Sequence, residues 1–213
     1  MPSAVYDKGC EAILDGTVNL EADTIKAVLL DLDDYGVAIT AASNASPISI
    51  TAAGHGLSTG NRVMIARVGG NTNANGVWVV TVVDANTFTL DGSSGNAAYT
   101  SGGRVIKLGA DSFLLDIPAA ARVATSAALA SKTFTAGVFD AADTVFTAAS
   151  GDPSEGVAIF EDTGAAGTSR LLSISDRKAD GTAFSVIPNG GDINLQFSAS
   201  GIFTVRTPVG QAA

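Results

Sequence analysis

The only histidine in the chain, His55, is the side chain best suited to acid–base chemistry near neutral pH. It stands between Gly54 and Gly56, and no carboxylate, cysteine or second histidine lies close to it in the sequence. A catalytic base needs a partner that orients its ring, and a metal site needs further ligands. The setting of His55 therefore indicates a turn or packing residue.

Ser58, Ser112 and Ser126 are candidate nucleophiles, but each would depend on His55 as its base. The sequence offers no identifiable carboxylate to orient that imidazole, so serine hydrolysis is disfavoured. Cys10 is the single cysteine and cannot form an internal disulfide. No second thiol or histidine cluster stands near it to build a metal site, so we expect a small apolar core residue.

Two further patterns suggest ligand sites but lack their essential parts. An acidic cluster that could attract calcium lacks the spaced ligands and closing glutamate of a calcium-binding hand; its residues are Asp31, Asp33 and Asp34. Neither Gly69-Gly70 nor Gly190-Gly191 opens a helix or precedes the lysine of a phosphate-binding loop, so both are interpreted as turns. The sequence thus predicts no catalytic, cofactor-binding or metal-binding residue, no cofactor and no enzyme activity.

Two polar segments leave a binding role open. Asn71 to Asn75 is rich in amide side chains, and Ser93 to Tyr99 contains an aromatic ring. Amides and aromatic rings suit the recognition of sugar hydroxyls. The pattern favours the alternative, which is that both segments are polar hairpin tips.

The composition predicts a folded, mainly β protein. Of 213 residues, 46% are hydrophobic and 15% are charged, which is enough apolar material to fill a core. The 24 glycines, together with many Ala, Ser, Thr, Asn and Asp residues, suit short strands and tight turns better than long helices.

The charge balance and the N-terminal residues restrict location and partners. Twelve basic against 21 acidic residues give a net charge of −9, which repels phosphates and argues against nucleic acid as a direct partner. The first residues lack a basic start and a sustained apolar run, so we expect neither a signal peptide nor a membrane span. We expect the mature chain to begin at or next to Met1, in a reducing cytoplasm.

Hydrophobic periodicity predicts one short helix and a series of strands. A helix that stops at Gly16 is indicated by the spacing of Tyr6, Cys10, Ile13 and Leu14. Strands are predicted at Thr24–Leu30, Arg122–Ser126, Lys132–Thr135, Asp143–Ala148, Gly156–Glu161, Ser169–Ser175, Asp192–Phe197 and Gly201–Val205. Gly156–Glu161 is nearly all apolar and should be central, paired with Ser169–Ser175 across the turn at Gly164–Thr168.

Between Ile48 and Leu108 the pattern predicts a separate small barrel or curled sheet. Its strands are expected at Ile48–Thr51, Arg62–Val68, Val77–Val83, Thr87–Leu90 and Arg104–Leu108. Dense turn formers separate them. The large aromatic side chains available to fill this module are Trp78, Phe88 and Tyr99.

Several short blocks in this stretch carry a resemblance: Pro47-Ile48-Ser49-Ile50, His55-Gly56-Leu57, Gly60-Asn61-Arg62-Val63, Asn75-Gly76-Val77-Trp78, Phe88-Thr89-Leu90 and Tyr99-Thr100-Ser101-Gly102-Gly103. Through them it resembles a β module common in bacteriophage structural proteins, which is similar to the small barrel domain first described in ubiquitin-activating enzymes. Ubiquitin chemistry is not implied, because no nucleotide-binding glycine loop or catalytic cysteine context accompanies the blocks.

The flanking residues carry a second set of blocks: Tyr6-Asp7, Asp23-Thr24-Ile25-Lys26-Ala27-Val28-Leu29-Leu30, Ile117-Pro118-Ala119-Ala120-Ala121-Arg122-Val123, Gly137-Val138-Phe139-Asp140-Ala141, Val157-Ala158-Ile159-Phe160-Glu161-Asp162-Thr163-Gly164, Thr168-Ser169-Arg170-Leu171-Leu172 and Pro188-Asn189-Gly190-Gly191-Asp192-Ile193. These blocks lie on both sides of the module. Through them the chain resembles a family of small tailed-phage virion proteins, usually encoded among capsid and tail genes.

This order implies a domain insertion, because the strand at Thr24–Leu30 needs the sheet formed after residue 110. We expect a discontinuous host domain of residues 1–41 plus 108–213, a β-sandwich or jelly-roll-like sheet with a short N-terminal helix. An inserted small β-barrel module should occupy residues 42–107.

The resemblance implies a noncatalytic virion structural protein that decorates or cements the head shell from its outer surface after synthesis in the bacterial cytoplasm. Its implied partners are the major capsid protein and further copies of the chain, as a homotrimer. The alternative is a tail, neck or fibre component whose β module recognises a host-surface glycan.

Overall fold

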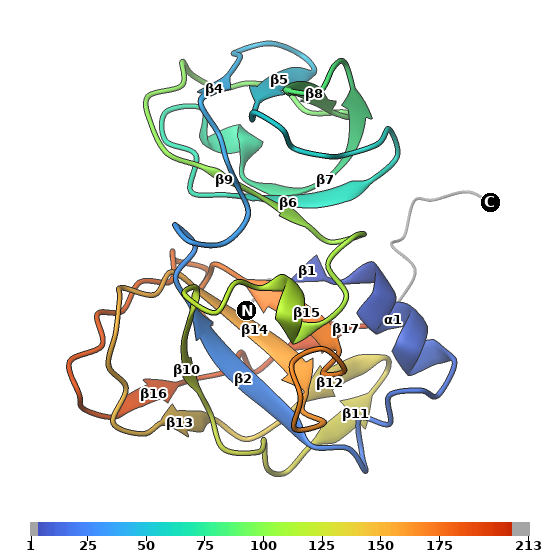
Figure 1. The fold of residues 1–213 in the computed structure, drawn as a ribbon, viewed down its shortest axis with the longest axis vertical. Helices are drawn as coiled ribbons and strands as arrows, with labels where there is room; N and C mark the ends of the chain where they lie inside the picture. The colour runs from blue at the N-terminus through green and yellow to red at the C-terminus, as the bar shows by residue number, and fades with distance from the viewer. Residues whose placement is uncertain (1–3, 206–213) are drawn as a thin grey trace. The chain divides into compact units, whose positions relative to one another are not determined.

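A computed structural model describes residues 4–205. The protein is mainly β, with 36% strand, one short N-terminal helix and several antiparallel sheets, among them a curled half-barrel sheet (Figure 1). The mainly β fold class predicted from the composition and periodicity is therefore confirmed.

The chain divides into two compact units. Unit 1 consists of Met1–Asp31 and Ser112–Ala213, and unit 2 of Leu32–Asp111. The predicted boundaries, 1–41 plus 108–213 around 42–107, require correction at both junctions. The reason is strand pairing: β3 (Val37–Ala38) pairs with β9 (Arg104–Lys107), and β4 (Ala41–Ala42) pairs with β5 (Ile48–Thr51), which draws the preceding segment into unit 2.

Unit 1 is organised on a five-stranded antiparallel sheet. Its order is β1 (Ala4–Val5), β15 (Leu171–Ser175), β14 (Gly156–Glu161), β2 (Ile25–Leu30) and β10 (Arg122–Thr125). Nearly every residue of the three middle strands is buried, so both faces of the sheet are covered. Burial on both faces explains why these strands read as apolar runs rather than as alternating patterns. The predicted central position of β14 and its pairing with β15 are confirmed.

A second layer covers one face of this sheet. It contains a three-stranded sheet, β11 (Thr133–Thr135), β12 (Val138–Asp140) and β17 (Phe203–Thr204), and a two-stranded sheet, β13 (Thr144–Phe146) and β16 (Ile193–Leu195). One hydrophobic cluster joins the layers, with Ala27, Leu29, Val157, Ile159 and Leu172 from the large sheet and Phe139, Phe146, Leu195 and Phe203 from the small ones. Unit 1 is thus a β-sandwich.

The helix α1 (Asp7–Leu14) packs closely on β15. A Cβ added at Gly9 would lie 2.2 Å from the carbonyl oxygen of Leu171, so this approach requires glycine. The predicted helix is present, but Leu14 is 73% exposed rather than on the buried face. The expectation for Leu14 was wrong because the buried side of this short helix centres on Gly9 and Ala12.

Unit 2 is one curled antiparallel sheet in the order β3, β9, β6 (Arg62–Ala66), β7 (Gly76–Val82), β8 (Thr87–Leu90), β5 and β4, with a short 3-10 helix, η1 (Thr72–Ala74). Its core is mostly aliphatic, and among the three expected aromatics only Phe88 is fully buried. Trp78 lies at the margin and donates a hydrogen bond to the Ala74 carbonyl. The Tyr99 hydroxyl similarly donates to backbone carbonyls at the rim of the core.

The two ends of unit 2 are tied together. The Tyr35 hydroxyl donates a 2.6 Å hydrogen bond to the carboxylate of Asp111. Beside it, Gly36 has a φ of 82°, and a Cβ there would lie 2.5 Å from the Val105 carbonyl oxygen. The chain therefore enters and leaves this unit at neighbouring points, as an insertion requires.

The single α-helix among the described residues is far shorter than the thickness of a membrane core, and no described helix is a candidate span.

We expect unit 1 to fold when residues 32–111 are replaced by a short Gly/Ser linker, because its main hydrophobic cluster contains no residue of unit 2. Calorimetry and circular dichroism should show a cooperative unfolding transition and retained β structure. The matched control is deletion of 42–107, which removes β9, the pairing partner of β3, and should give a less stable protein. Equal loss of structure in both deletions would contradict a division of the chain after Asp31 and before Ser112.

The hairpin of β11 and β12 contains a replaceable strained residue. Its two-residue loop has Ala136 at φ 52° and Gly137 at φ 78°. Two positive φ angles define a type I′ turn, which favours Asn-Gly, and the left-handed region costs alanine about 1 kcal/mol. Ala136→Asn should therefore raise the free energy of unfolding in urea by up to about 1 kcal/mol. Ala136→Val, which introduces a β-branched side chain, should lower it; the reverse ranking would contradict this turn geometry.

Candidate functional site

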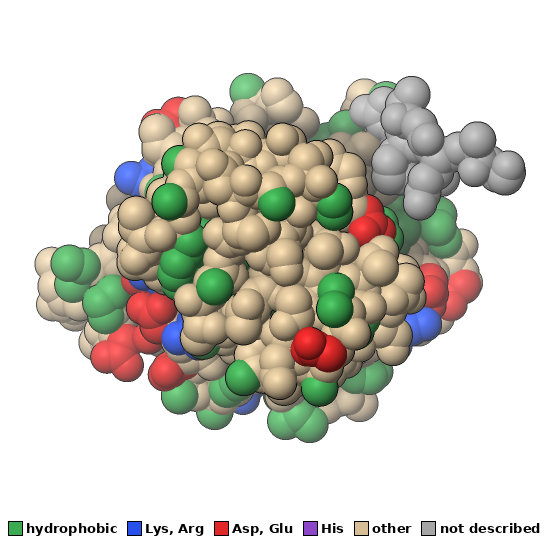
Figure 2. Space-filling view, turned by 90° about the horizontal axis from the view of Figure 1, so that it is seen from above, with side chains coloured by type: hydrophobic (Ala, Val, Ile, Leu, Met, Phe, Trp, Pro, Cys, Tyr) green, Lys and Arg blue, Asp and Glu red, His purple; other side chains and the backbone are tan. Residues whose placement is uncertain are grey.

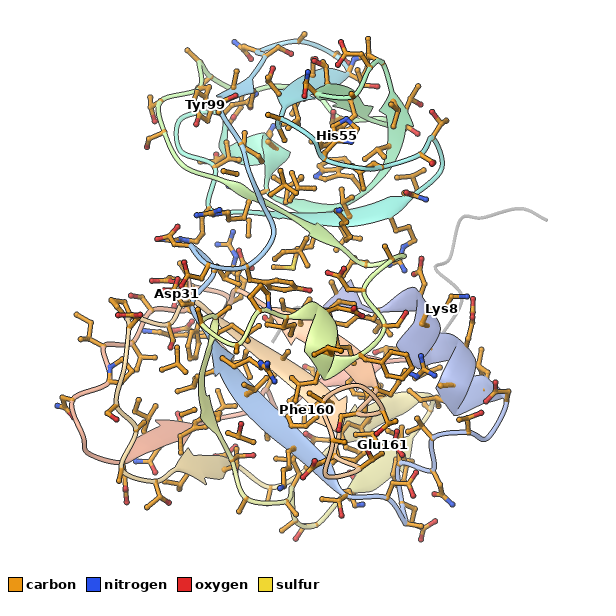
Figure 3. The ribbon with its side chains drawn as sticks, in the orientation of Figure 1. Lys8, Asp31, His55, Tyr99, Phe160 and Glu161 are labelled. Carbon is orange, nitrogen blue, oxygen red and sulfur yellow. The ribbon has the colours of Figure 1, made fainter. Side chains whose placement is uncertain are left out.

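His55 is locked inside unit 2 (Figure 3). Its side chain is 1% exposed and meets the ring of Phe88 edge-on at 5.1 Å between centroids. The Leu57 amide donates to Nδ1 at 3.0 Å, so Nε2 carries the proton and donates to the Asp84 carbonyl, also at 3.0 Å. Both ring nitrogens are thus engaged by backbone groups, which leaves neither for substrate or metal.

The Ser126 side chain and the backbone amides of Ser58 and Ser112 form local hydrogen bonds. The Ser126 hydroxyl accepts from the Ala27 amide at 3.0 Å and donates to the Ala127 carbonyl at 2.7 Å, which fastens the segment after β10 to β2. The Ser58 amide is capped by Asn61, and the Ser112 amide by Asp116. Cys10 is partly buried and forms no disulfide.

Some residues of the candidate ligand patterns also have partners within the protein. Asp33 forms ion pairs with Arg67 at 2.9 Å and Arg104 at 3.7 Å. Gly69 pairs with Ser101, and a Cβ at Gly70 would lie 2.1 Å from the Ala98 carbonyl oxygen. The turn at 190–191 is held by an amide hydrogen bond from Gly190 to the Ala149 carbonyl. Both glycine pairs are turns that pack against neighbouring chain.

The two polar loops of unit 2 are bonded to each other. The Asn96 side chain accepts from the Asn73 amide at 3.2 Å and donates to Thr72 Oγ1 at 2.9 Å. In return, Asn71 Oδ1 accepts from the Asn96 amide at 3.1 Å, and Asn73 Nδ2 donates to the Ser94 carbonyl. These amides therefore hold the loops together. Many of the loop donors and acceptors that a sugar would need are therefore already hydrogen-bonded within the protein.

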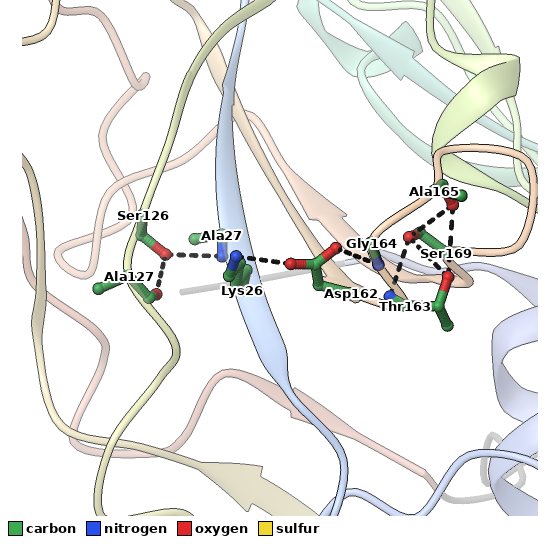
Figure 4. Close-up of polar contacts among 9 residues, drawn as sticks. All are labelled: Lys26, Ala27, Ser126, Ala127, Asp162, Thr163, Gly164, Ala165 and Ser169. Carbon is green, nitrogen blue, oxygen red and sulfur yellow. Dashed lines mark hydrogen bonds and ion pairs between the residues drawn. The ribbon is translucent and has the colours of Figure 1, made fainter.

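A polar cluster in unit 1 joins β2 to the turn that follows β14 (Figure 4). Lys26 forms an ion pair with Asp162, and the same carboxylate accepts from the Gly164 amide at 3.0 Å. The Ser169 hydroxyl donates to the Ala165 carbonyl at 2.9 Å and accepts from the Thr163 amide. These bonds fix the β14–β15 turn.

Two adjacent carboxyl groups of this cluster, Glu161 and Asp162, have pKa values that are shifted in opposite directions. Burial raises the pKa of Glu161, and the negative charge of Asp23 raises it further, while Arg170 opposes the change. The pKa of Asp162 is lowered by the hydrogen bond from Lys26 and by the Gly164 amide. No local sequence pattern indicates this arrangement, because Asp23 and Glu161 are brought together only by the pairing of β2 with β14.

Charge is distributed unequally between the units. Unit 1 contains sixteen acidic and eight basic residues, which gives a net charge of −8. Unit 2 contains five acidic and four basic residues, which gives a net charge of −1. Uncharged polar groups with scattered hydrophobic side chains dominate the face of the protein that Figure 2 shows.

Unit 1 has two surface hollows that sequence reasoning did not find. The larger, about 390 Å³, runs beside β16 and is lined by residues 178–180, 184–186 and 193–196. The other, about 350 Å³, lies after α1 and is lined in part by Ile13, Leu20 and Phe134. Each combines segments distant in sequence, so no local pattern marks it.

No family model matches the chain, and no curated protein is significantly similar to it.

Neutralising the two adjacent carboxyl groups should have opposite effects on stability. Because the pKa of Glu161 is raised in the folded state, its ionisation opposes folding, so Glu161→Gln should stabilise at pH 7. Because the pKa of Asp162 is lowered, Asp162→Asn should cost roughly 1 kcal/mol at pH 7.

Both effects should shrink on acidification. The gain in Glu161→Gln should vanish as the pH falls below about 4.3, where an unfolded glutamate is protonated. The loss in Asp162→Asn should vanish as the pH falls through the lowered folded pKa. Urea unfolding from pH 7 to pH 3 measures both, and effects of the same sign at pH 7 would contradict this assignment.

Proposed function

We propose that this protein is a noncatalytic structural component of a tailed-bacteriophage virion, a decoration or cement protein on the outer surface of the head shell. It is made in the cytoplasm of the bacterial host. The sequence blocks on either side of unit 2, and those within it, support this reading through their resemblance to phage structural proteins.

The main structural support for this proposal is the way that polar side chains in unit 2 are hydrogen-bonded. Several of the polar side chains weighed for chemistry in unit 2 bond backbone or a neighbouring loop, as His55 and Asn96 illustrate. An enzyme needs groups held ready for substrate, with their hydrogen-bonding capacity unspent. A scaffold uses the same groups to fix its loops. Unit 2 fits the second description.

The charge distribution suits the outer surface of a shell filled with nucleic acid. Unit 1, with a net charge of −8, would be repelled by packaged DNA. Unit 2 is close to neutral, so contact with a protein surface would desolvate few charges. The proposed partner is therefore the major capsid protein, not nucleic acid.

Stabilisation of a shell follows from repetition. A subunit that contacts neighbouring capsomers adds a modest free energy at each position, and many copies multiply it. Self-association strengthens the effect because several weak contacts then act together. A homotrimer is the proposed state, since symmetric assembly suits threefold positions of a shell.

The alternative, a tail, neck or fibre component that recognises a glycan, depends on the loops at Asn71–Asn75 and Ser93–Tyr99. Their amides are bonded to each other, so sugar hydroxyls would have to displace existing hydrogen bonds. This cost makes the glycan role the weaker proposal.

Purified protein should bind expanded empty capsids of its phage at a saturable ratio and raise the temperature at which they disassemble. Sedimentation measures the ratio, and calorimetry of the capsids measures the stabilisation. The matched control is the variant in which a short linker replaces residues 32–111, which separates the contribution of each unit. Binding to host envelope polysaccharide without binding to capsids would contradict decoration and favour the tail component.

A further inference from the structure

The second layer of the unit 1 sandwich is incomplete beside β16. This strand pairs with β13 on one side only, in a sheet of two strands (Figure 1). On its other side lies the hollow of about 390 Å³. An unpaired strand edge presents backbone donors and acceptors that can template another strand.

The register identifies which backbone groups of β16 face the hollow. Leu195 lies opposite Thr144 and Ile193 opposite Phe146. The amide of Phe197 donates to the Asp143 carboxylate at 2.8 Å, and the Gly191 carbonyl accepts from Ala149 at 3.0 Å. Odd-numbered residues therefore direct their backbone groups toward β13. Because backbone direction alternates along a strand, Asn194 and Gln196 direct theirs toward the hollow.

The wall of the hollow opposite β16, formed by residues 184–186, also presents backbone hydrogen-bonding groups. The Phe184 amide donates to the Asp176 carbonyl at 2.8 Å, and Val186 exchanges two hydrogen bonds with Ser154. These even-numbered residues bond away from the hollow, so Ser185 between them presents its amide and carbonyl to it. Within residues 4–205, those groups of Ser185 form no hydrogen bond. Two extended backbone edges thus face each other across the hollow.

The floor of the hollow is apolar. Phe184 and Leu195 belong to the main hydrophobic cluster, and Val186 and Ile193 pack against it. A strand residue occupies roughly 155 Å³, from its rise, the strand spacing and the sheet spacing. A hollow of about 390 Å³ therefore accommodates two to three residues of an extended segment. This matches the length of β16.

The geometry points to a strand-addition site: an extended segment of a different protein inserts between β16 and residues 184–186. Its backbone bonds both edges, and its inward side chains, small or apolar, rest on Phe184 and Leu195. Its outward side chains carry Lys or Arg. Asp180 lines the hollow and Asp192 precedes β16, and although Lys178 also lines it, unit 1 as a whole has a net charge of −8.

This site does not depend on the decoration role, because any partner that supplies such a strand would satisfy it. Main-chain bonds supply most of the affinity in strand addition, so a generic peptide of the right pattern is a fair probe. We choose a fluorescently labelled peptide, acetyl-Thr-Val-Lys-Val-Lys-Val-Thr-amide, which alternates apolar and polar or basic residues.

The peptide should bind the full-length protein saturably in a fluorescence anisotropy titration. Asn194→Pro removes the amide that faces the hollow and leaves the ladder to β13 intact, so binding should weaken by at least about tenfold. The matched control Asn194→Ala keeps that amide and should bind as the wild type does. Ser185→Pro and Ser185→Ala form a second pair on the opposite wall, in case one proline variant fails to fold.

Amide hydrogen exchange supplies a site-specific readout. Bound peptide should slow exchange at Asn194 and Gln196 while Leu195, already bonded to β13, changes little. Absence of binding at millimolar peptide, or equal binding by the proline and alanine variants, would overturn the proposal. Self-association of the wild type that Asn194→Pro abolishes and Asn194→Ala retains would overturn the choice of a foreign strand, since a second copy would then fill the site.

Discussion

The pairing of β2 is the constraint on which the rest of the fold depends. Both of its neighbours in the sheet, β10 and β14, come from sequence that follows unit 2. Strand β2 therefore finds its partners only if the chain returns to the point where it left. The Tyr35–Asp111 hydrogen bond and the β3–β9 pairing hold the ends of unit 2 together and meet this requirement. A folded module with adjacent ends replaces a long flexible loop, whose closure entropy would otherwise oppose the pairing.

Burial of β2 on both faces has a further consequence for the surface. Unit 1 places its apolar side chains in the sandwich core and on the second face of the central sheet, so most of its charged residues lie outside the strands, with Lys26 and Glu161 among the exceptions. Acidic residues outnumber basic ones in this unit, and Asp162 is neutralised by an ion pair with Lys26. Unit 2 fills its core with aliphatic side chains and fixes its loops with uncharged amides, which leaves little net charge. The two units therefore differ in the net charge of their residues.

Local pattern predicts those elements that carry a periodic signal of their own. The predicted strands agree with β2, β5, β8 and β14 to within a residue, because an apolar run or strict alternation marks each of them. The two-residue strands β3 and β4 carry no periodicity, and only their partners make them strands, so the predicted boundaries of the inserted module are too narrow. The same limit applies to the candidate sites. Turn chemistry around His55 is local and can be predicted, whereas the Glu161–Asp23 contact and the hollow beside β16 arise from tertiary pairing.

The contrast between the two layers of unit 1 indicates where the sandwich can accept a partner. The large sheet is continuous across five strands, whereas the opposing layer is interrupted between β16 and the bridge that joins Ser154 to Val186. Among the described residues, the buried Ser154 hydroxyl has no hydrogen-bond partner, which is unfavourable. The continuous five-stranded sheet fixes the strand register of unit 1. A gap in the facing layer costs little stability as long as the hydrophobic core beneath it remains covered. Such a division lets one face determine the fold while the other keeps backbone groups available for recognition.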